Sequence, residues 1–155
     1  MKMFNLTLKI NLDNVLNSIL AESAWKAAHQ ADTYCLTRDN SAMLERHIAH
    51  AFTAFCAHAA AYVTARNYNP NIDDDNISVS LAFFNPPAEA TADSLKELLE
   101  QLLASWALSA FYGIRDERGH ESIYHLAWRR ARAGIMAALA KDCRSNALAA
   151  LCPRP

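Results

Sequence analysis

Histidine is the residue type in this sequence that could most readily bind a metal ion or transfer a proton, and three of the six histidines fall in one short stretch. His47, His50 and His58 would lie within roughly 80° of one another around a single helix. Along the helix axis, however, His47 and His58 would be about 16 Å apart. One ion bonds its ligands at about 2 Å and cannot bind both. His47 and His50 would form at most half of a metal site, so a polar helix edge or a contact surface is the simpler interpretation.

A second pair of histidines, His120 and His125, flanks Glu121 and superficially resembles the helix of a zinc protease. That mechanism needs two histidines four residues apart on one helix face. His120 and His125 are five residues apart and about 140° apart around a helix, so we reject this interpretation. An alternative stays open, namely a metal-binding or enzymatic helical bundle in which His47 and His50 gain His120 or His125 from another helix.

Motifs for other catalytic chemistry are missing from the sequence. Three isolated glycines cannot form a glycine-rich phosphate loop, and no serine lies in a GxSxG elbow. Asp73, Asp74 and Asp75 could bind calcium loosely, but they lack the glycine and the distal glutamate of an EF-hand loop, and a solvated turn is the simpler interpretation. We therefore expect no catalytic residue, no metal and no cofactor, in a protein that is not an enzyme.

The charged residues are divided unevenly along the chain. Residues 1–114 hold 7 Lys and Arg against 12 Asp and Glu, whereas residues 115–155 hold 8 against 4. An ordinary solvated helix face around Arg129, Arg130 and Arg132 is one interpretation. Another is that the acidic part of one copy meets the basic part of the next, since head-to-tail contacts of this kind can close into rings. A small regulator that binds DNA through these arginines is a third, although the net charge of -1 does not favour direct nucleic-acid binding.

Aromatic residues cluster on both sides of the predicted turn between the last two long helices. Most of them would fill the core of a helical hairpin, and some would be left for an interface, where Trp, Tyr and Arg are enriched. The candidate interface residues are Arg129, Arg130, Arg132, Trp128, Trp106 and Tyr112.

Length and composition describe one helix-rich domain, residues 1–155. The chain has 155 residues, 30 of them alanine, and its hydrophobic fraction of 52% can fill a sizeable core. We expect no secretory signal and no membrane span, and therefore a soluble intracellular protein. The four cysteines form no CxxC pair and are predicted to be free thiols, with Cys56 as a small buried hydrophobe.

Two short segments with alternating polarity predict strands, and four longer segments with helical periodicity predict helices. Residues 3–10 and 76–84 are the predicted strands, expected to pair with each other or with a neighbouring subunit. The helices are expected over residues 11–30, 39–66, 94–113 and about 116–142, with a polar loop at 67–75 and a possible short helix at 146–151. The predicted fold class is α+β, mainly helical, with a four-helix bundle-like core, a small two-stranded β element and the order β-α-α-β-α-α.

The predicted core residues follow from the same periodicity. They are Phe4, Leu6, Leu8, Ile10, Leu12, Val15, Leu16, Ile19 and Leu20; Leu44, Ile48, Phe52, Phe55, Ala59, Tyr62 and Val63; Ile77, Val79, Leu81 and Phe83; Leu95, Leu98, Leu99, Leu102, Leu103 and Trp106; and Ile123, Ala127, Ala131, Ile135, Ala138 and Leu139.

Three stretches of the chain resemble small structural proteins of tailed phages and prophages from gut bacteria. They are the strand that runs directly into a helix over residues 3–20, the strand at 78–84 followed by two prolines, and the leucine-rich helix that ends in Trp106-Ala-Leu-Ser-Ala-Phe-Tyr112.

The resemblance implies a connector-type or completion-type subunit of the neck or tail, assembled in rings, and it supplies no catalytic residue. The expected function is therefore non-enzymatic virion assembly. The expected partners are further copies of the chain and adjacent virion proteins such as portal, connector or tail proteins, without a membrane. The expected location is the virion, and the cytoplasm of the bacterial host during assembly.

Overall fold

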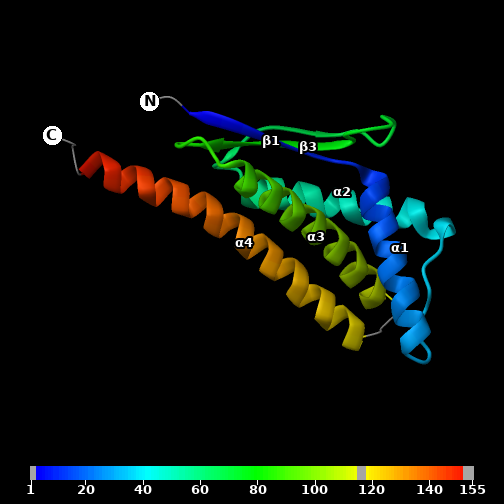
Figure 1. Cartoon of the computed structure of the whole chain (residues 1–155). Helices are drawn as coiled ribbons and strands as arrows, with labels where there is room; N and C mark the ends of the chain where they lie inside the picture. The colour runs from blue at the N-terminus through cyan, green and yellow to red at the C-terminus, as the bar shows by residue number, and fades with distance from the viewer. Residues whose placement is uncertain (1–2, 115–117, 152–155) are drawn as a thin grey trace.

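The computed structural model describes residues 3–114 and 118–151, without the side chains of residues 118–122, 145–146 and 148–151. A small sheet lies along one side of the molecule and the helices lie on its other side (Figure 1). The elements in chain order are β1 (Phe4–Ile10), α1 (Leu12–His29), the short 3-10 helix η1 (Arg38–Asn40), α2 (Ser41–His58), β2 (Val63–Tyr68), β3 (Ile77–Phe83), α3 (Glu89–Ile114) and α4 (Arg118–Leu151).

The sheet has three antiparallel strands in the order β1-β3-β2. The two strands predicted from the sequence pair directly, from Phe4 opposite Phe83 to Ile10 opposite Ile77, as expected. Their alternating apolar side chains turn toward the helices, and the opposite face is polar. On that outer face the hydroxyls of Thr7 and Ser80 are hydrogen-bonded at 2.8 Å.

The third strand, β2, corrects the sequence prediction of a second helix that continued to Arg66. Helix α2 ends at His58, and Val63–Tyr68 pairs with β3 instead. The predicted helical stripe ran through Tyr62 and Val63, and these side chains pack against the core from the strand. Local periodicity favoured a helix, but the unpaired edge of β3 gives this segment a ladder of backbone hydrogen bonds. The observed order is therefore β-α-α-β-β-α-α, with three strands in place of two.

The last two helices form a long antiparallel hairpin, and α3 also contacts α1, α2 and β1. Helix α3 begins at Glu89, five residues before the predicted start at residue 94. Helix α4 continues through residues 146–151, which were expected to form a separate short helix. Ile123 was predicted to face the core, but it is 54% exposed and its neighbour Tyr124 is buried in its place.

The predicted core is otherwise largely formed. The buried apolar residues of α1, α2 and α3 pack into one cluster with those of the strands. The strand residues in this cluster are Leu8, Ile10, Ile77, Val79, Leu81 and Phe83. The fully enclosed members at its centre include Ile10, Ile19, Leu44, Ile48, Ile77, Leu81, Leu95, Leu99, Leu102 and Leu103. Ala131, Ile135 and Leu139 of α4 are also buried, as expected.

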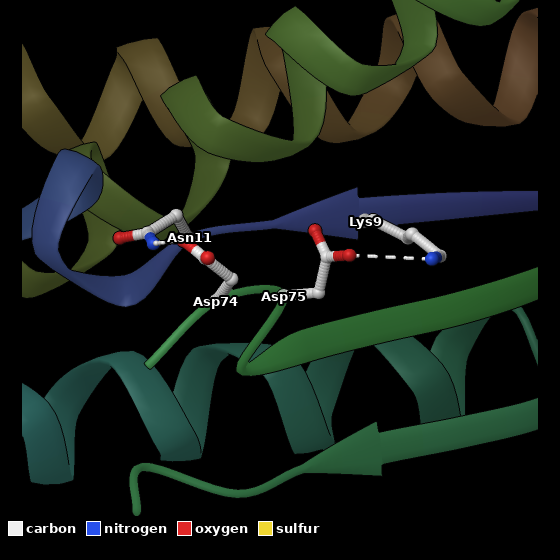
Figure 2. Close-up of polar contacts among 4 residues, drawn as sticks. All are labelled: Lys9, Asn11, Asp74 and Asp75. Carbon is white, nitrogen blue, oxygen red and sulfur yellow. Dashed lines mark hydrogen bonds and ion pairs between the residues drawn. The ribbon is translucent and has the colours of Figure 1, made fainter. Parts of the chain in front are cut away.

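The acidic turn before β3 is held to the start of α1 (Figure 2). The Asn11 amide accepts a hydrogen bond from Asn14 N–H as the N-cap of α1 and donates to the carbonyl of Asp73 and to Asp74 Oδ1. The Lys9 ammonium forms an ion pair with Asp75 at 3.2 Å. These contacts give the turn a structural role, in agreement with its interpretation as a turn.

Asp142 attaches α4 to the end of β3. Its carboxylate accepts hydrogen bonds from the backbone N–H groups of Phe84 at 2.6 Å and Asn85 at 3.1 Å, and from the Asn85 side chain at 2.9 Å. The prolines that follow continue the chain toward α3, so this one carboxylate fixes where the strand ends relative to α4.

Candidate interaction surface

Helices α1 and α3 end, and α4 begins, at the same end of the molecule (Figure 1). Large apolar side chains on these parts of the chain are exposed. We call this group the apolar end. Its members are Trp25 (57% exposed), Tyr34 (37%), Ile114 (70%), Ile123 (54%) and Leu126 (52%).

Ring contacts join the elements that carry the apolar end. Tyr34 packs against Phe111 of α3, with the ring centroids 5.6 Å apart. The Lys26 ammonium lies over the Tyr124 ring of α4, 4.6 Å from its centroid. The backbone segments that carry the exposed side chains are therefore held together by contacts in the core. A surface with a fixed backbone is suited to docking.

The arginines singled out from the sequence lie on α4, beside the apolar end. Arg129 and Arg130 are exposed. Arg132 is half-buried, with its guanidinium 5.1 Å from the centroid of the Trp128 ring. Trp128 in turn packs on Trp106 of α3, with centroids 4.6 Å apart. All six candidate interface residues lie on the α3–α4 hairpin, and five of them are exposed or half-buried. The two tryptophans are half-buried between the helices.

Tyr112, the sixth candidate, is a core residue. Its side chain is fully buried and stacks on Tyr124, with ring centroids 5.7 Å apart. The Tyr124 hydroxyl donates a hydrogen bond to Glu22 at 3.0 Å, and burial together with this carboxylate raises the pKa of Tyr124. We therefore leave Tyr112 out of the candidate surface.

A cavity of about 550 Å³, which we call the histidine cavity, lies where α2, α3 and α4 meet. His47 and His50 reach it from α2 and His125 reaches it from α4, next to Trp106 and Trp128. The pair of α2 histidines therefore does gain a histidine from another helix, as the metal-bundle alternative required. Sequence spacing alone could not place His125 there because the contact depends on how α4 packs.

Two of the three imidazole rings of this cavity pack against tryptophan rings. His50 meets Trp106 edge to face at 5.8 Å, and His125 meets Trp128 in the same way at 5.1 Å. Within the described residues, no group of three or more His, Cys, Asp or Glu side chains is placed to hold a metal ion. The side chain of His120, the other suggested partner, lies outside the described residues.

His47 is the most confined of the three histidines. Its Nε2 atom is buried and has no hydrogen-bond partner among the described residues. Burial lowers the pKa of His47, and the positive charge that His50 can carry lowers it further. His47 is therefore held in its neutral form within the fold.

A second groove, of about 580 Å³, runs between α1, α3 and α4. Glu22, Glu97 and Glu100 line it together with Tyr124, and we call it the acidic groove. Sequence reasoning missed this groove, since its three carboxylates come from two helices that are far apart in the chain. The only available signal was the acidic balance of the first 114 residues.

The cysteines in the described part of the chain are free thiols, as predicted. Cys35, Cys56 and Cys143 are free, and burial raises the pKa of the Cys56 thiol. Cys56 is a buried residue of α2, as predicted. Cys152 lies outside the described residues.

Comparison with family models, curated proteins and solved structures finds no match to this chain. None of the helices in the described residues is long and apolar enough to cross a membrane. Four features of the described surface bear on function. They are the apolar end, the α4 arginines, the histidine cavity and the acidic groove.

Proposed function

We propose that this chain is a non-enzymatic virion assembly protein, a connector or completion subunit of a phage neck or tail that acts through ring-forming protein contacts. The observation that carries the proposal is the apolar end beside the exposed arginines of α4. The resemblance of the sequence to phage structural proteins supports the same function.

The composition of this surface is typical of a protein-binding site. Tryptophan, tyrosine and arginine supply most of the binding energy at interfaces. Trp25, Tyr34 and Arg129 offer these side chains at one end of the molecule.

The partners we propose are further copies of the chain and the virion proteins next to it, such as portal, connector or tail proteins. The sheet offers an additional contact, because β1 and β2 are its edge strands and each has one side without a strand partner in the described part of the chain. An extended segment of a neighbouring protein can add to such an edge. The protein would be made in the host cytoplasm and function in the virion.

A double charge reversal tests this proposal. Changing Arg129→Glu and Arg130→Glu together should prevent the chain from entering particles while the monomer keeps its helical content and unfolding midpoint. The matched control reverses two exposed cations near the other end of the same helix, Lys141→Glu and Arg144→Glu, and should leave incorporation unchanged. Normal incorporation of the Arg129/Arg130 variant would contradict the proposed role of this surface.

The histidine cavity favours a second candidate function, a metal-binding or enzymatic bundle. His125 joins His47 and His50 at its walls. Elemental analysis of protein purified without a metal-affinity step decides between the two. Stoichiometric metal that is lost in a His47→Gln, His50→Gln variant would favour the second candidate, and metal-free protein would exclude it.

A further inference from the structure

The two sides of the α3–α4 hairpin differ in charge. The acidic groove lies on the side that faces α1, and the histidine cavity lies on the side that faces α2. Both are formed by the same two helices, and their volumes of about 580 and 550 Å³ are similar.

The acidic groove carries carboxylates that have no ion-pair partner in the described part of the chain. Within the described residues, no Lys, Arg or His nitrogen lies within 4.0 Å of Glu22, Glu97 or Glu100. Asp93 lies one helical turn before Glu97 on the same face of α3 and is also exposed. The apolar floor of the groove includes Ile123 of the apolar end.

The side of the histidine cavity is basic. None of the described residues that line the cavity is acidic. Arg129 lies four residues after His125, and Arg46 lies four residues before His50, so each exposed guanidinium shares a helix face with a histidine of the cavity. Ile114 of the apolar end lies in the cavity wall.

We propose that the acidic groove of one copy binds the basic side of the next copy, with Arg129 and Arg46 facing Glu97 and Glu100. This inference rests on the proposed function and names the partner surface for its ring-forming contact. Complementary charge sets the orientation of such a contact, and the two exposed isoleucines supply its apolar part.

The geometry of this contact determines the kind of assembly. The two surfaces lie on different sides of one molecule, so the contact cannot be a two-fold, self-complementary one. After two copies have bound, the pair keeps one free acidic groove and one free basic side. A contact of this type continues until the rotation closes a ring.

A charge exchange between the two surfaces tests the inference. The groove variant carries Glu97→Lys and Glu100→Lys, and the basic-side variant carries Arg46→Glu and Arg129→Glu. Glu22 and Arg132 are left unchanged because they contact Tyr124 and Trp128 within the fold. The distribution of masses in solution is measured by sedimentation for the wild type, each variant, an equal mixture of the two, and a single chain with all four changes.

The wild type should form oligomers whose association weakens as salt is added. Each two-residue variant alone should associate more than about tenfold more weakly than the wild type, since like charges then face each other at the contact. The equal mixture and the four-residue variant should assemble again, because each restores opposite charges at every contact. Damage to the fold cannot produce this recovery.

Two results would overturn the inference. One is a wild type that stays monomeric at about 100 µM in low salt, where attraction between opposite charges is screened least. The other is oligomers that persist in the two-residue variants. Either result leaves the proposed function standing if the chain is still found in particles, since its contacts there would then be with other virion proteins.

Discussion

At the scale of single residues, His47 links stability to pH. Burial keeps the pKa of His47 below the ordinary value of 6.5 in the folded state. Below about pH 6.5 the unfolded chain therefore binds a proton that the folded chain does not. The free energy of unfolding should fall as the pH decreases from about 6.5 toward the pKa of the folded state, and this histidine should contribute nothing to the pH dependence above that range.

Urea unfolding at a series of pH values from about 7.5 to 5 measures this effect. A His47→Gln variant should show a shallower decrease in stability over the same range than the wild type. His58→Gln is the matched control, since His58 is an exposed histidine at the end of the same helix. Equal pH dependence in the wild type and His47→Gln would show that burial of His47 does not govern its protonation.

Ile123 was predicted to be buried, but Tyr124 is buried instead. This difference shows which core residues of a helix can be predicted from periodicity and which cannot. Ala131, Ile135 and Leu139 were placed correctly on the inner face of α4, since they lie near the centre of its apolar stripe. The first turns are different, because Tyr124 is held inside by partners from elsewhere, Tyr112 of α3 and Lys26 of α1. Such contacts between distant segments have no local signal in the sequence.

At the scale of secondary-structure elements, Asp142 is the clearest link between α4 and the sheet. Replacement of Asp142 by Ala should lower the free energy of unfolding by about 2 kcal/mol, because hydrogen bonds to a charged group are lost and the N–H of Phe84 is left without its acceptor. Asp142→Asn should cost less, since an amide oxygen can still accept one of these bonds. Urea unfolding is the measurement.

Asp93→Ala serves as the control for Asp142, since Asp93 is an exposed carboxylate on the partner helix of the same hairpin. It should change the free energy of unfolding by less than about 0.5 kcal/mol. An equal loss of stability in the Asp93 and Asp142 variants would mean that the three hydrogen bonds do not fix the end of β3 to α4.

Strand β2 was the element that could not be predicted from the sequence. Segments 3–10 and 76–84 alternate in polarity, so their pairing could be anticipated. Residues 59–66 have apolar side chains at a spacing that suits the end of a helix. Residues 59–62 form a turn instead, and β2 begins at Val63. The loop at 69–76 returns the chain along β3, with Asn69 N–H bonded to the Asn76 carbonyl and the Asn76 side chain accepting from Leu12 N–H.

At the scale of the whole molecule, charge is arranged by packing as well as by position in the sequence. The numbers of acidic and basic residues in each part of the chain could be counted from the sequence. The surfaces on which these residues lie could not be predicted. Helix α4 takes part in both the acidic groove and the histidine cavity, and only the packing of α1 and α2 on either side of the hairpin separates the two. The apolar end likewise combines residues from three helices and a loop, so its members could not be grouped in advance.

The function proposed for the whole molecule is tested most directly in the particle itself. Virions purified from a host that carries this gene can be digested and analysed by quantitative mass spectrometry against the other structural proteins. We expect the chain at a fixed copy number per particle, and its loss from particles made with the Arg129→Glu, Arg130→Glu variant. Particles that are complete and infectious without the chain would contradict a role in virion assembly.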